Sequence, residues 1–291
     1  MHVVKTVKRV RYPVVAGYFY PSRREDLVKV VEWSFKHRLG PGSLPQVVEQ
    51  GPRMVVGYVV PHAGYIYSGP VAAHAYYDLA RDGAPQTLVI LGTNHTGLGK
   101  PIAVYPSGEW QTPLGSLEVD EELGKKVVEY SDIADLDEEA HLEEHSVEVQ
   151  LPFIQYIYGS RVKILPVVIG IHTPSVAADL AESILRATRE LGRDVVVLAS
   201  SDFNHYEPHD VTVKKDEAAI NKVIELDAQG FYNLIVERNI SVCGPGGIMT
   251  LIEIARRTGA KAKLLKYATS GDVSGEKSAV VGYAAVRVAR E

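Results

Sequence analysis

Histidines follow the most apolar segments of this chain at three separate places. His62, His95 and His205 come shortly after segments 54–60, 87–91 and 195–199, whose apolar and β-branched residues predict buried strands. The carboxyl ends of parallel strands share one edge of an α/β sheet, where ligand crevices form. We therefore expect these imidazoles, and Asp202 beside His205, to converge. Because neutral imidazole is the commonest metal ligand, the pattern predicts an open transition-metal site. The alternative for each histidine alone is a loop residue satisfied by local hydrogen bonds.

The only cysteine, Cys243, lies in the glycine-rich segment 241–247, just ahead of a predicted helix. Backbone N–H groups at a helix start favour a thiolate, which would make Cys243 a further metal ligand or a nucleophile. The alternative is a buried, small apolar residue, which is the usual fate of a lone cysteine. The glycines do not form a phosphate-binding loop, because G-x-x-x-x-G-K-[ST] is absent.

A third cluster is the acidic segment 143–148, which contains His145 and Glu148. These two residues are three apart and would share one face of a helix, where they could line a pocket. The alternative is the solvated start of an acidic helix. No H-E-x-x-H zinc motif is present. Ser200 and Ser201 lack the G-x-S-x-G elbow of a nucleophilic serine.

The elements that must position these residues alternate between strands and helices. The strongest strands are apolar throughout, as is typical of strands buried on both faces, so the sheet is expected between layers of helices. We predict one α/β domain over residues 1–291, with a helix/sheet/helix arrangement and a mostly parallel central sheet. Further strands are predicted at 101–105, 162–169, 263–268 and 279–288, and helices at 22–38, 69–81, 120–130, 174–191, 210–226, 227–238 and 247–257.

Three details of this assignment depend on single residues. Ser22 and Glu25 have the spacing of a capping box at the start of the first helix. Pro152 interrupts segment 145–158 and leaves its structure ambiguous. The acidic segment 132–144 is predicted to be exposed. Tyr65 and Tyr67 either line a pocket or pack in the core.

The composition excludes several classes of protein. Of the 291 residues, 46% are hydrophobic and 23% are charged, which is typical of a globular chain. The net charge is -5 and no basic run occurs, so a nucleic-acid partner is not expected. No apolar run approaches the roughly 20 residues of a membrane helix.

The basic segment 1–12 lacks an apolar signal core, and a lone cysteine suits a reducing cytoplasm. Only 16 residues are Asn, Gln, Cys or Met, as in thermophile proteins.

Several motifs, in order along nearly the whole chain, resemble those of the Memo family, whose prokaryotic members are also called AmmeMemoRadiSam system protein B. The resemblance is carried by VVAGYFYP at 14–21, PHAGYIYSG at 61–69, LGTNH at 91–95, EHSVE at 144–148 with LPF at 151–153, SSDFNHY at 200–206 and VCG at 242–244.

This resemblance implies a fold similar to that of class III extradiol dioxygenases, which are non-haem iron enzymes. It implies metal ligands at His62, His95 and Cys243, whereas the dioxygenases use two histidines and a glutamate. Cys243 is therefore a departure from the dioxygenase pattern. His205 matches the general acid/base of the dioxygenases, with Asp202 beside it. The expected pocket also includes Tyr65, Asn94, His145 and Glu148.

We therefore expect a metal-dependent redox enzyme, an oxidase or a dioxygenase-like enzyme, that uses iron or copper, or zinc, on a small-molecule substrate. The first alternative is a binding module whose retired pocket holds a peptide, since the similar vertebrate Memo proteins are linked to signalling and cell motility by partner binding. The second is a zinc-dependent hydrolase, in which a metal-bound water attacks the substrate.

Overall fold

The apolar segments predicted as strands form the centre of one large sheet. The computed structural model describes residues 9–291, and its central parallel strands lie in the order β2 (Val55–Val60), β9 (Val195–Ser200), β3 (Thr87–Thr93) and β8 (Lys163–Ile169). The sheet is therefore parallel where the predicted site residues leave it.

Antiparallel strands extend this sheet on both sides and make it mixed. Beyond β8 lie β4 (Ile102–Val104) and β7 (Asp135–Leu136). Beyond β2 lies β12 (Val280–Ala289), which also pairs with β10 (His205–Glu207) and β11 (Lys261–Thr269). A separate three-stranded sheet contains β1 (Val10–Arg11), β5 (Glu109–Thr112) and β6 (Gly115–Glu118).

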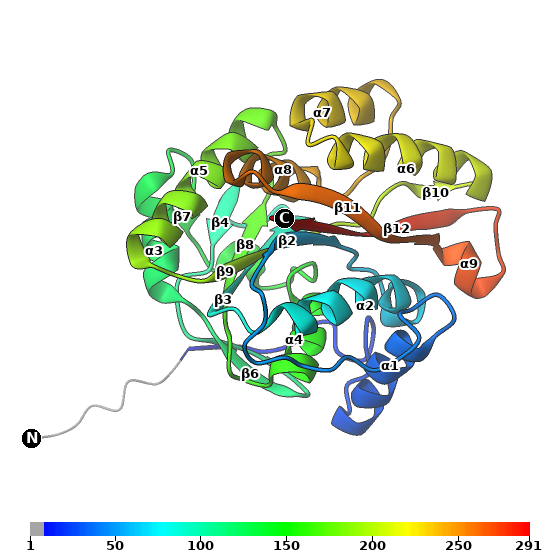
Figure 1. Ribbon diagram of the computed structural model, residues 1–291, viewed down its shortest axis with the longest axis horizontal. Coiled ribbons are helices and arrows are strands. Elements are labelled where there is room, and N and C mark those ends of the chain that lie inside the picture. Colours follow the sequence, from blue (N-terminus) through cyan, green and yellow to red (C-terminus); the bar gives the residue numbers. More distant parts are fainter. Residues whose placement is uncertain (1–8) are drawn as a thin grey trace, which may run out of the picture.

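Helices cover both faces of the large sheet (Figure 1). One face carries α1 (Arg24–Lys36), α2 (Tyr65–Asp82) and α4 (Leu151–Tyr158), and the other carries α3 (Glu121–Tyr130), α5 (Pro174–Leu191), α6 (His209–Ile224), α7 (Ala228–Glu237) and α8 (Pro245–Thr258). Short helices complete the chain: η1 (Glu139–His141), η2 (Glu148–Gln150) and α9 (Ser270–Ser274). The predicted α/β class with helices on both faces is confirmed.

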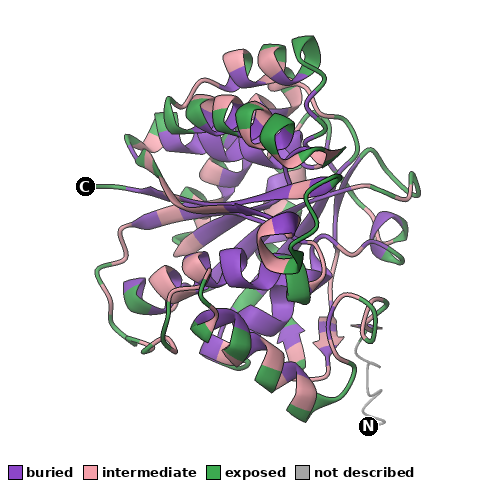
Figure 2. Cartoon of the chain, turned by 90° about the vertical axis from the view of Figure 1, so that its right-hand side faces the viewer, coloured by how far each residue is buried: buried purple, intermediate pink, exposed green. Residues whose placement is uncertain are grey.

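The pleat of the strands divides the apolar side chains between two cores. In β3, Leu88 and Ile90 belong to the core under α1, α2 and α4, whereas Val89 and Leu91 belong to the core under α5 and α8. Figure 2 shows the resulting buried sheet between helices that are exposed on their outer faces. Strands buried on both sides explain why the sequence has apolar runs there instead of alternation.

Side-chain and glycine caps fix several helix ends. The Thr173 side chain accepts from the Val176 N–H at the start of α5, and Gly192 ends that helix in the left-handed conformation. The Asp227 carboxylate caps α7 in the same way through the Gly230 N–H. These caps satisfy N–H and C=O groups that have no partner within the helix.

Other local predictions are wrong. The Ser22–Glu25 capping box does not form, because α1 begins at Arg24 and its N-cap residue is Arg23, which makes no side-chain cap. Helix α2 begins at Tyr65 and contains Pro70 in its second turn. Segment 132–144 is not uniformly exposed, since His141 and Glu144 are fully buried.

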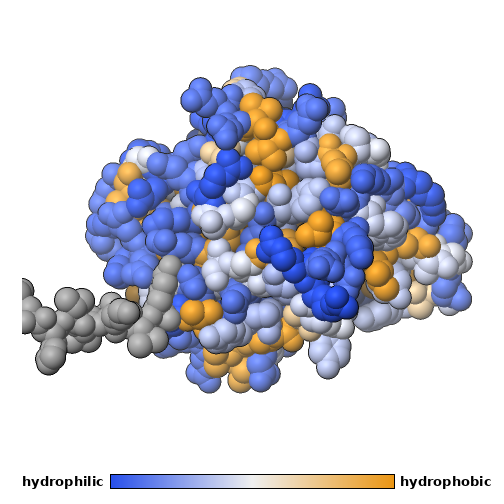
Figure 3. Space-filling view, turned by 90° about the horizontal axis from the view of Figure 1, so that it is seen from below, coloured by the Kyte–Doolittle hydropathy of each residue, from blue (hydrophilic) through white to orange (hydrophobic). Residues whose placement is uncertain are grey.

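The surface of the molecule is mixed. On the face drawn in Figure 3, apolar side chains form separate patches among hydrophilic ones. Within residues 9–291, no helix is both long enough and apolar enough to cross a lipid bilayer. Residues 1–8 of the basic N-terminal segment lie outside the described part of the chain.

Candidate metal centre

The predicted site residues lie around one pocket at the carboxyl ends of the parallel strands. His62 follows β2, His95 follows β3, and Asp202 and His205 follow β9, while Cys243 comes just before α8. All five line a cavity of about 400 Å³, together with Phe19, His145 and Tyr206. The expected convergence of these residues is therefore found.

His62, His95 and Cys243 bring two ring nitrogens and one sulfur together. One potential ligand atom from each residue lies within 4.8 Å of the other two. The Cys243 Sγ is 3.1 Å from the His62 Nε2. Bonds of roughly 2.0–2.3 Å to one ion would place two ligand atoms about 3.5 Å apart. The His62 and Cys243 ligand atoms would therefore share an ion after moving apart by a few tenths of an ångström.

The hydrogen bonds around His62 define which ring nitrogen is free. Its Nδ1 lies 2.9 Å from the Ser200 Oγ, which itself donates to the Ser146 carbonyl. Ser200 therefore accepts, His62 Nδ1 carries the proton, and Nε2 keeps its lone pair toward Cys243. Burial lowers the pKa of His62 well below its usual value, and the nearby His145 and His95 lower it further. The ring is therefore in the neutral form that binds metals.

His95 is oriented in the same way by a carboxylate. Its Nδ1 donates to the Glu144 Oε1 at 2.9 Å, and its backbone N–H donates to the Oε2 at 2.7 Å. Burial alone would raise the pKa of Glu144, but the hydrogen bond from His95, the charges of His95 and His145, and the Ser146 N–H lower it to about 2. A carboxylate that holds the outer nitrogen of a ligating histidine is common in metal sites.

His145 is a third imidazole beside this set. Its ring stacks on His95 with centroids 4.5 Å apart and contacts Phe19 at 4.6 Å. Burial lowers its pKa to about 4, although the Glu144 charge opposes the shift. His95, Glu144 and His145 form a second group with ligand atoms within 4.8 Å. A neutral imidazole therefore walls the pocket on the His95 side.

Cys243 is not the activated thiolate that its place before a helix predicted. Its Sγ accepts from the Asp202 N–H at 3.1 Å, whereas the Gly244 N–H donates to the Ser201 Oγ. Burial raises the pKa of the thiol, and the Asp202 charge raises it further. Without a cation the thiol is protonated and donates to His62. A bound metal ion would reverse this, since a coordinating thiol loses its proton.

Asp202 and His205 form a further group around the Cys243 sulfur. The Asp202 Oδ1 accepts from the His62 N–H at 2.8 Å, and burial raises the pKa of this carboxyl to about 6. The His205 Nδ1 donates to the Ser241 carbonyl at 2.8 Å, so its Nε2 is free to take a proton. Their ligand atoms lie within 4.8 Å of each other and of the Cys243 Sγ. This pair can exchange protons with a molecule in the pocket.

Three residues expected in the pocket lie elsewhere. Tyr65 is buried in the core, and its hydroxyl donates to the Val149 carbonyl. The Asn94 side chain folds onto its own loop and accepts from the Gly97 N–H. Glu148 is fully buried behind the pocket wall, where it accepts from Arg11 and Tyr20. Glu148 and His145 therefore do not share a helix face, because the chain is irregular between them. The alternative, that this segment is the solvated start of an acidic helix, is also wrong, because Glu148 is buried.

Glu144 and His172 were not predicted as site residues, although each belongs to a sequence pattern that predicted others. Glu144 precedes His145 in the recognised motif, but its role depends on contact with His95 from a distant part of the chain. His172 follows β8 as the other histidines follow their strands, and its Nδ1 accepts from the Gly246 N–H at the start of α8. Burial lowers the pKa of His172 to about 4. The rule of a histidine after a buried strand, applied to segment 162–169, would have identified it.

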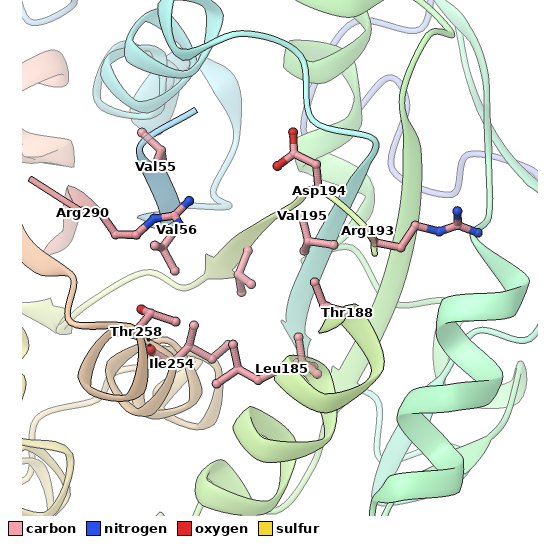
Figure 4. A pocket seen from close by; sticks show the side chains of 12 residues that line it. Val55, Val56, Leu185, Thr188, Arg193, Asp194, Val195, Ile254, Thr258 and Arg290 are labelled. Atoms are coloured by element: carbon pink, nitrogen blue, oxygen red, sulfur yellow. Dashed lines mark hydrogen bonds between the residues drawn. The ribbon is translucent and has the colours of Figure 1, made fainter. Parts of the chain in front are cut away.

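A cavity at the other end of the sheet lacks such chemistry. It lies near the amino-terminal ends of β2 and β9, and its volume is about 210 Å³. Figure 4 shows mostly aliphatic side chains around it, including Val56, Leu185 and Ile254, while the Arg193 guanidinium points away. The pocket at the carboxyl ends of the strands is therefore the stronger candidate site.

Comparisons with known proteins agree on one family. The model of the Memo-like protein family matches residues 11–287. A MEMO1 family protein of Desulfurococcus amylolyticus is 61% identical over 95% of this chain and 98% of its own length. Others from Ignicoccus hospitalis and Sulfurisphaera tokodaii are 54% and 51% identical, each over 96% of this chain and over 98% and 99% of their own lengths.

One solved structure has a partial likeness. An uncharacterized protein of Escherichia coli K12 aligns with 80% of this chain and 98% of its own, at 13% identity and a TM-score of 0.49. The extent and identity of the sequence matches establish the relationship without it. The chain belongs to the Memo-like protein family.

Proposed function

We propose that this protein holds a transition-metal ion between His62, His95 and Cys243 and works as a metal-dependent redox enzyme on a small-molecule substrate. One observation carries the proposal. Both histidines have their Nδ1 proton engaged, by Ser200 and by Glu144, which leaves each Nε2 as the ligand atom beside the Cys243 sulfur. A metal ion would take the place of the thiol proton that lies between the His62 Nε2 and the Cys243 sulfur.

The donor set limits the metal. Two imidazoles and a thiolate suit iron, copper or zinc better than magnesium or calcium, which prefer oxygen ligands. Three protein ligands leave coordination positions open, as in catalytic sites. When bound, an iron or copper ion would supply one-electron chemistry and a position for oxygen or substrate.

The residues of this chain would prepare the reaction around the ion. Asp202 holds the His62 backbone through its Oδ1 and places a carboxyl of raised pKa at the pocket. His205, fixed by the Ser241 carbonyl, would take or return a proton at its Nε2. Phe19 and His145 would limit water on the His95 side. A lone reduced cysteine suits the cytoplasm, where we propose that the protein acts.

Metal analysis of the purified protein, with anomalous scattering at the pocket, tests the binding part of this proposal. We expect one ion within bonding distance of both Nε2 atoms and Sγ. Two other groups among the described residues could hold an ion. An ion bound only at His95, Glu144 and His145, or only at Asp202, His205 and Cys243, would contradict the proposed ligands.

Oxygen dependence tests the reaction class. A redox enzyme should consume oxygen with a panel of small phenols and thiols only when iron or copper is bound. A zinc-dependent hydrolase would act on ester probes without oxygen, and a peptide-binding module would keep its ligand affinity after chelation. Either of these results would replace the redox proposal.

A further inference from the structure

A second cavity adjoins the candidate metal pocket. Its volume is about 410 Å³, and it lies over β12 and the segment that contains α9. Ala63, Tyr206 and Val281 line both cavities, so these three residues form the wall that they share. A molecule that enters the metal pocket on this side therefore meets the second cavity.

The lining of the second cavity has a distinct chemistry. Three tyrosines, Tyr67, Tyr206 and Tyr283, supply aromatic rings, and Glu276 supplies a carboxylate. Hydrogen bonds from Ser278 lower the pKa of Glu276, so it carries a negative charge. Among the described residues that line this cavity there is no Lys, Arg or His. Aromatic faces and a carboxylate attract cations, and the absence of a lining cation disfavours anions.

The backbone is distorted at the residue that the cavities share. Tyr206 has a φ of 60°, a left-handed conformation that a residue with a side chain rarely adopts. It sits in a bulge of the β10–β12 ladder, where the register shifts between His205 and Glu207. A bulge redirects side chains at functional sites. Here it places His205 at the metal pocket and Tyr206, which is 77% exposed, on the common wall.

We propose that the tyrosine-lined cavity is a substrate subsite that takes an organic cation, a substituted ammonium group on an apolar or aromatic body. This inference rests on the proposed function only in that the other end of the same substrate would lie in the metal pocket. Tyr67, Tyr206 and Tyr283 contact the cation and its body, and Glu276 supplies the counter-charge. Tyr206 thereby determines specificity, because it is the ring between the subsite and the metal ligands.

Metal-free protein titrated with benzyltrimethylammonium, benzyl alcohol and phenylacetate tests the subsite by chemical-shift changes. The cation should bind about tenfold or more tightly than the alcohol, and phenylacetate should bind more weakly still. Glu276→Gln and Tyr206→Leu should each weaken cation binding by about fivefold or more. The matched controls Glu217→Gln and Tyr12→Leu, exposed residues outside both cavities, should not change it.

Equal affinity for the cation and the alcohol, or unchanged affinity in both cavity variants, would overturn the subsite. A parallel metal titration of Glu276→Gln separates the two proposals, since this variant should bind metal as the wild type does. Cation binding without metal binding would remove the proposed function and keep the subsite. Metal binding without a preference for the cation would remove the subsite alone.

Discussion

At the scale of single residues, Glu144 determines how His95 faces the pocket. Its carboxylate is fully buried and accepts from the His95 ring as well as from the His95, His145 and Ser146 N–H groups. A side chain that fixes both the position and the tautomer of a ligand controls metal affinity without a contact to the metal.

Glu144→Gln should therefore weaken metal binding by about 10- to 100-fold. The amide can orient the His95 ring through its oxygen, but it lacks the charge that makes the imidazole a stronger ligand. Competition with a chelator of known affinity measures the change. Glu143→Gln is the matched control, because Glu143 is the exposed neighbour and should leave the affinity unchanged. Equal effects of the two substitutions would contradict this role.

At the scale of elements, a buried ion pair ties the N-terminal segment to the region behind the pocket. Arg11 of β1 donates to Glu148 at the start of η2, and both side chains are buried. Glu148 also accepts from the Val14 and Val15 N–H groups and from the Tyr20 hydroxyl. The loop that carries Phe19 to the pocket is held between these contacts.

Glu148→Gln should lower the free energy of unfolding by about 3–5 kcal/mol, because it leaves the Arg11 guanidinium buried without a counter-charge. Urea unfolding measures the loss. The double variant with Arg11→Met should lose less than the sum of the two single variants. Glu121→Gln breaks an exposed pair with Lys125 and should cost under about 1 kcal/mol. A similarly small loss at Glu148 would show that the contacts do not hold the segment.

A second element contact links α6 to the loop of the candidate acid/base residues. The Asp216 Oδ1 accepts from the Asn204 N–H and its Oδ2 accepts from the Tyr267 hydroxyl. A Cβ at Gly282 would lie 1.7 Å from that Oδ2, so β12 needs glycine there. Burial raises the pKa of Asp216 from 3.8 to about 7.

The raised pKa predicts the sign of a pH effect on stability. The folded chain binds the Asp216 proton more tightly than the unfolded chain does. The stabilisation that this proton gives to the fold is therefore complete below about pH 4 and is lost as the pH rises through about 7. In the wild type, this proton should make the free energy of unfolding fall by up to about 4 kcal/mol over this pH range. Asp216→Asn should abolish that fall. Unfolding at a series of pH values measures the slope. Asp210→Asn, an exposed change in the same helix, should keep the wild-type slope, and a wild-type slope in Asp216→Asn would refute the assignment.

The elements also show what a sequence can and cannot reveal. Strands such as β3 were predictable because every side chain enters one of two cores. The strands β5 and β6 were not, since they are short and polar, and Trp110 is buried against Tyr105 and against the distant Arg11 and His141. His62, His95 and Asp202 were predictable from their places after strands. Tyr65, by contrast, depends on where α2 begins, which the sequence leaves open.

At the scale of the whole molecule, the two cores share the same strands. Leu88 and Leu91 of β3 point to opposite cores. Because both cores pack on the same strands, unfolding of the sheet would disrupt them together. We therefore expect one cooperative unfolding transition, in keeping with the prediction of a single domain. From the scarcity of thermolabile residues, we predict that this transition lies above the roughly 45–65 °C of mesophile domains.

Leu88→Ala and Leu91→Ala test this cooperativity. Each should shift the same transition and lower the free energy of unfolding by about 2–5 kcal/mol, because each leaves a cavity in one core. Calorimetry with tryptophan fluorescence and far-UV circular dichroism measures the transition by independent probes. Two separate transitions, each sensitive to only one of the substitutions, would contradict the single unit.

The central claim, that His62, His95 and Cys243 hold a metal ion, is tested most directly by one paired measurement on wild type and Cys243→Ser. Metal-free samples of both are titrated with Fe²⁺ and Zn²⁺ without oxygen, and both are melted in the metal-free state. We predict an affinity loss greater than the roughly 10- to 100-fold of an outer-shell change, since a neutral hydroxyl replaces a thiolate, with a nearly unchanged melting temperature. Unchanged affinity with a lowered melting temperature would make Cys243 a buried structural residue and contradict the account.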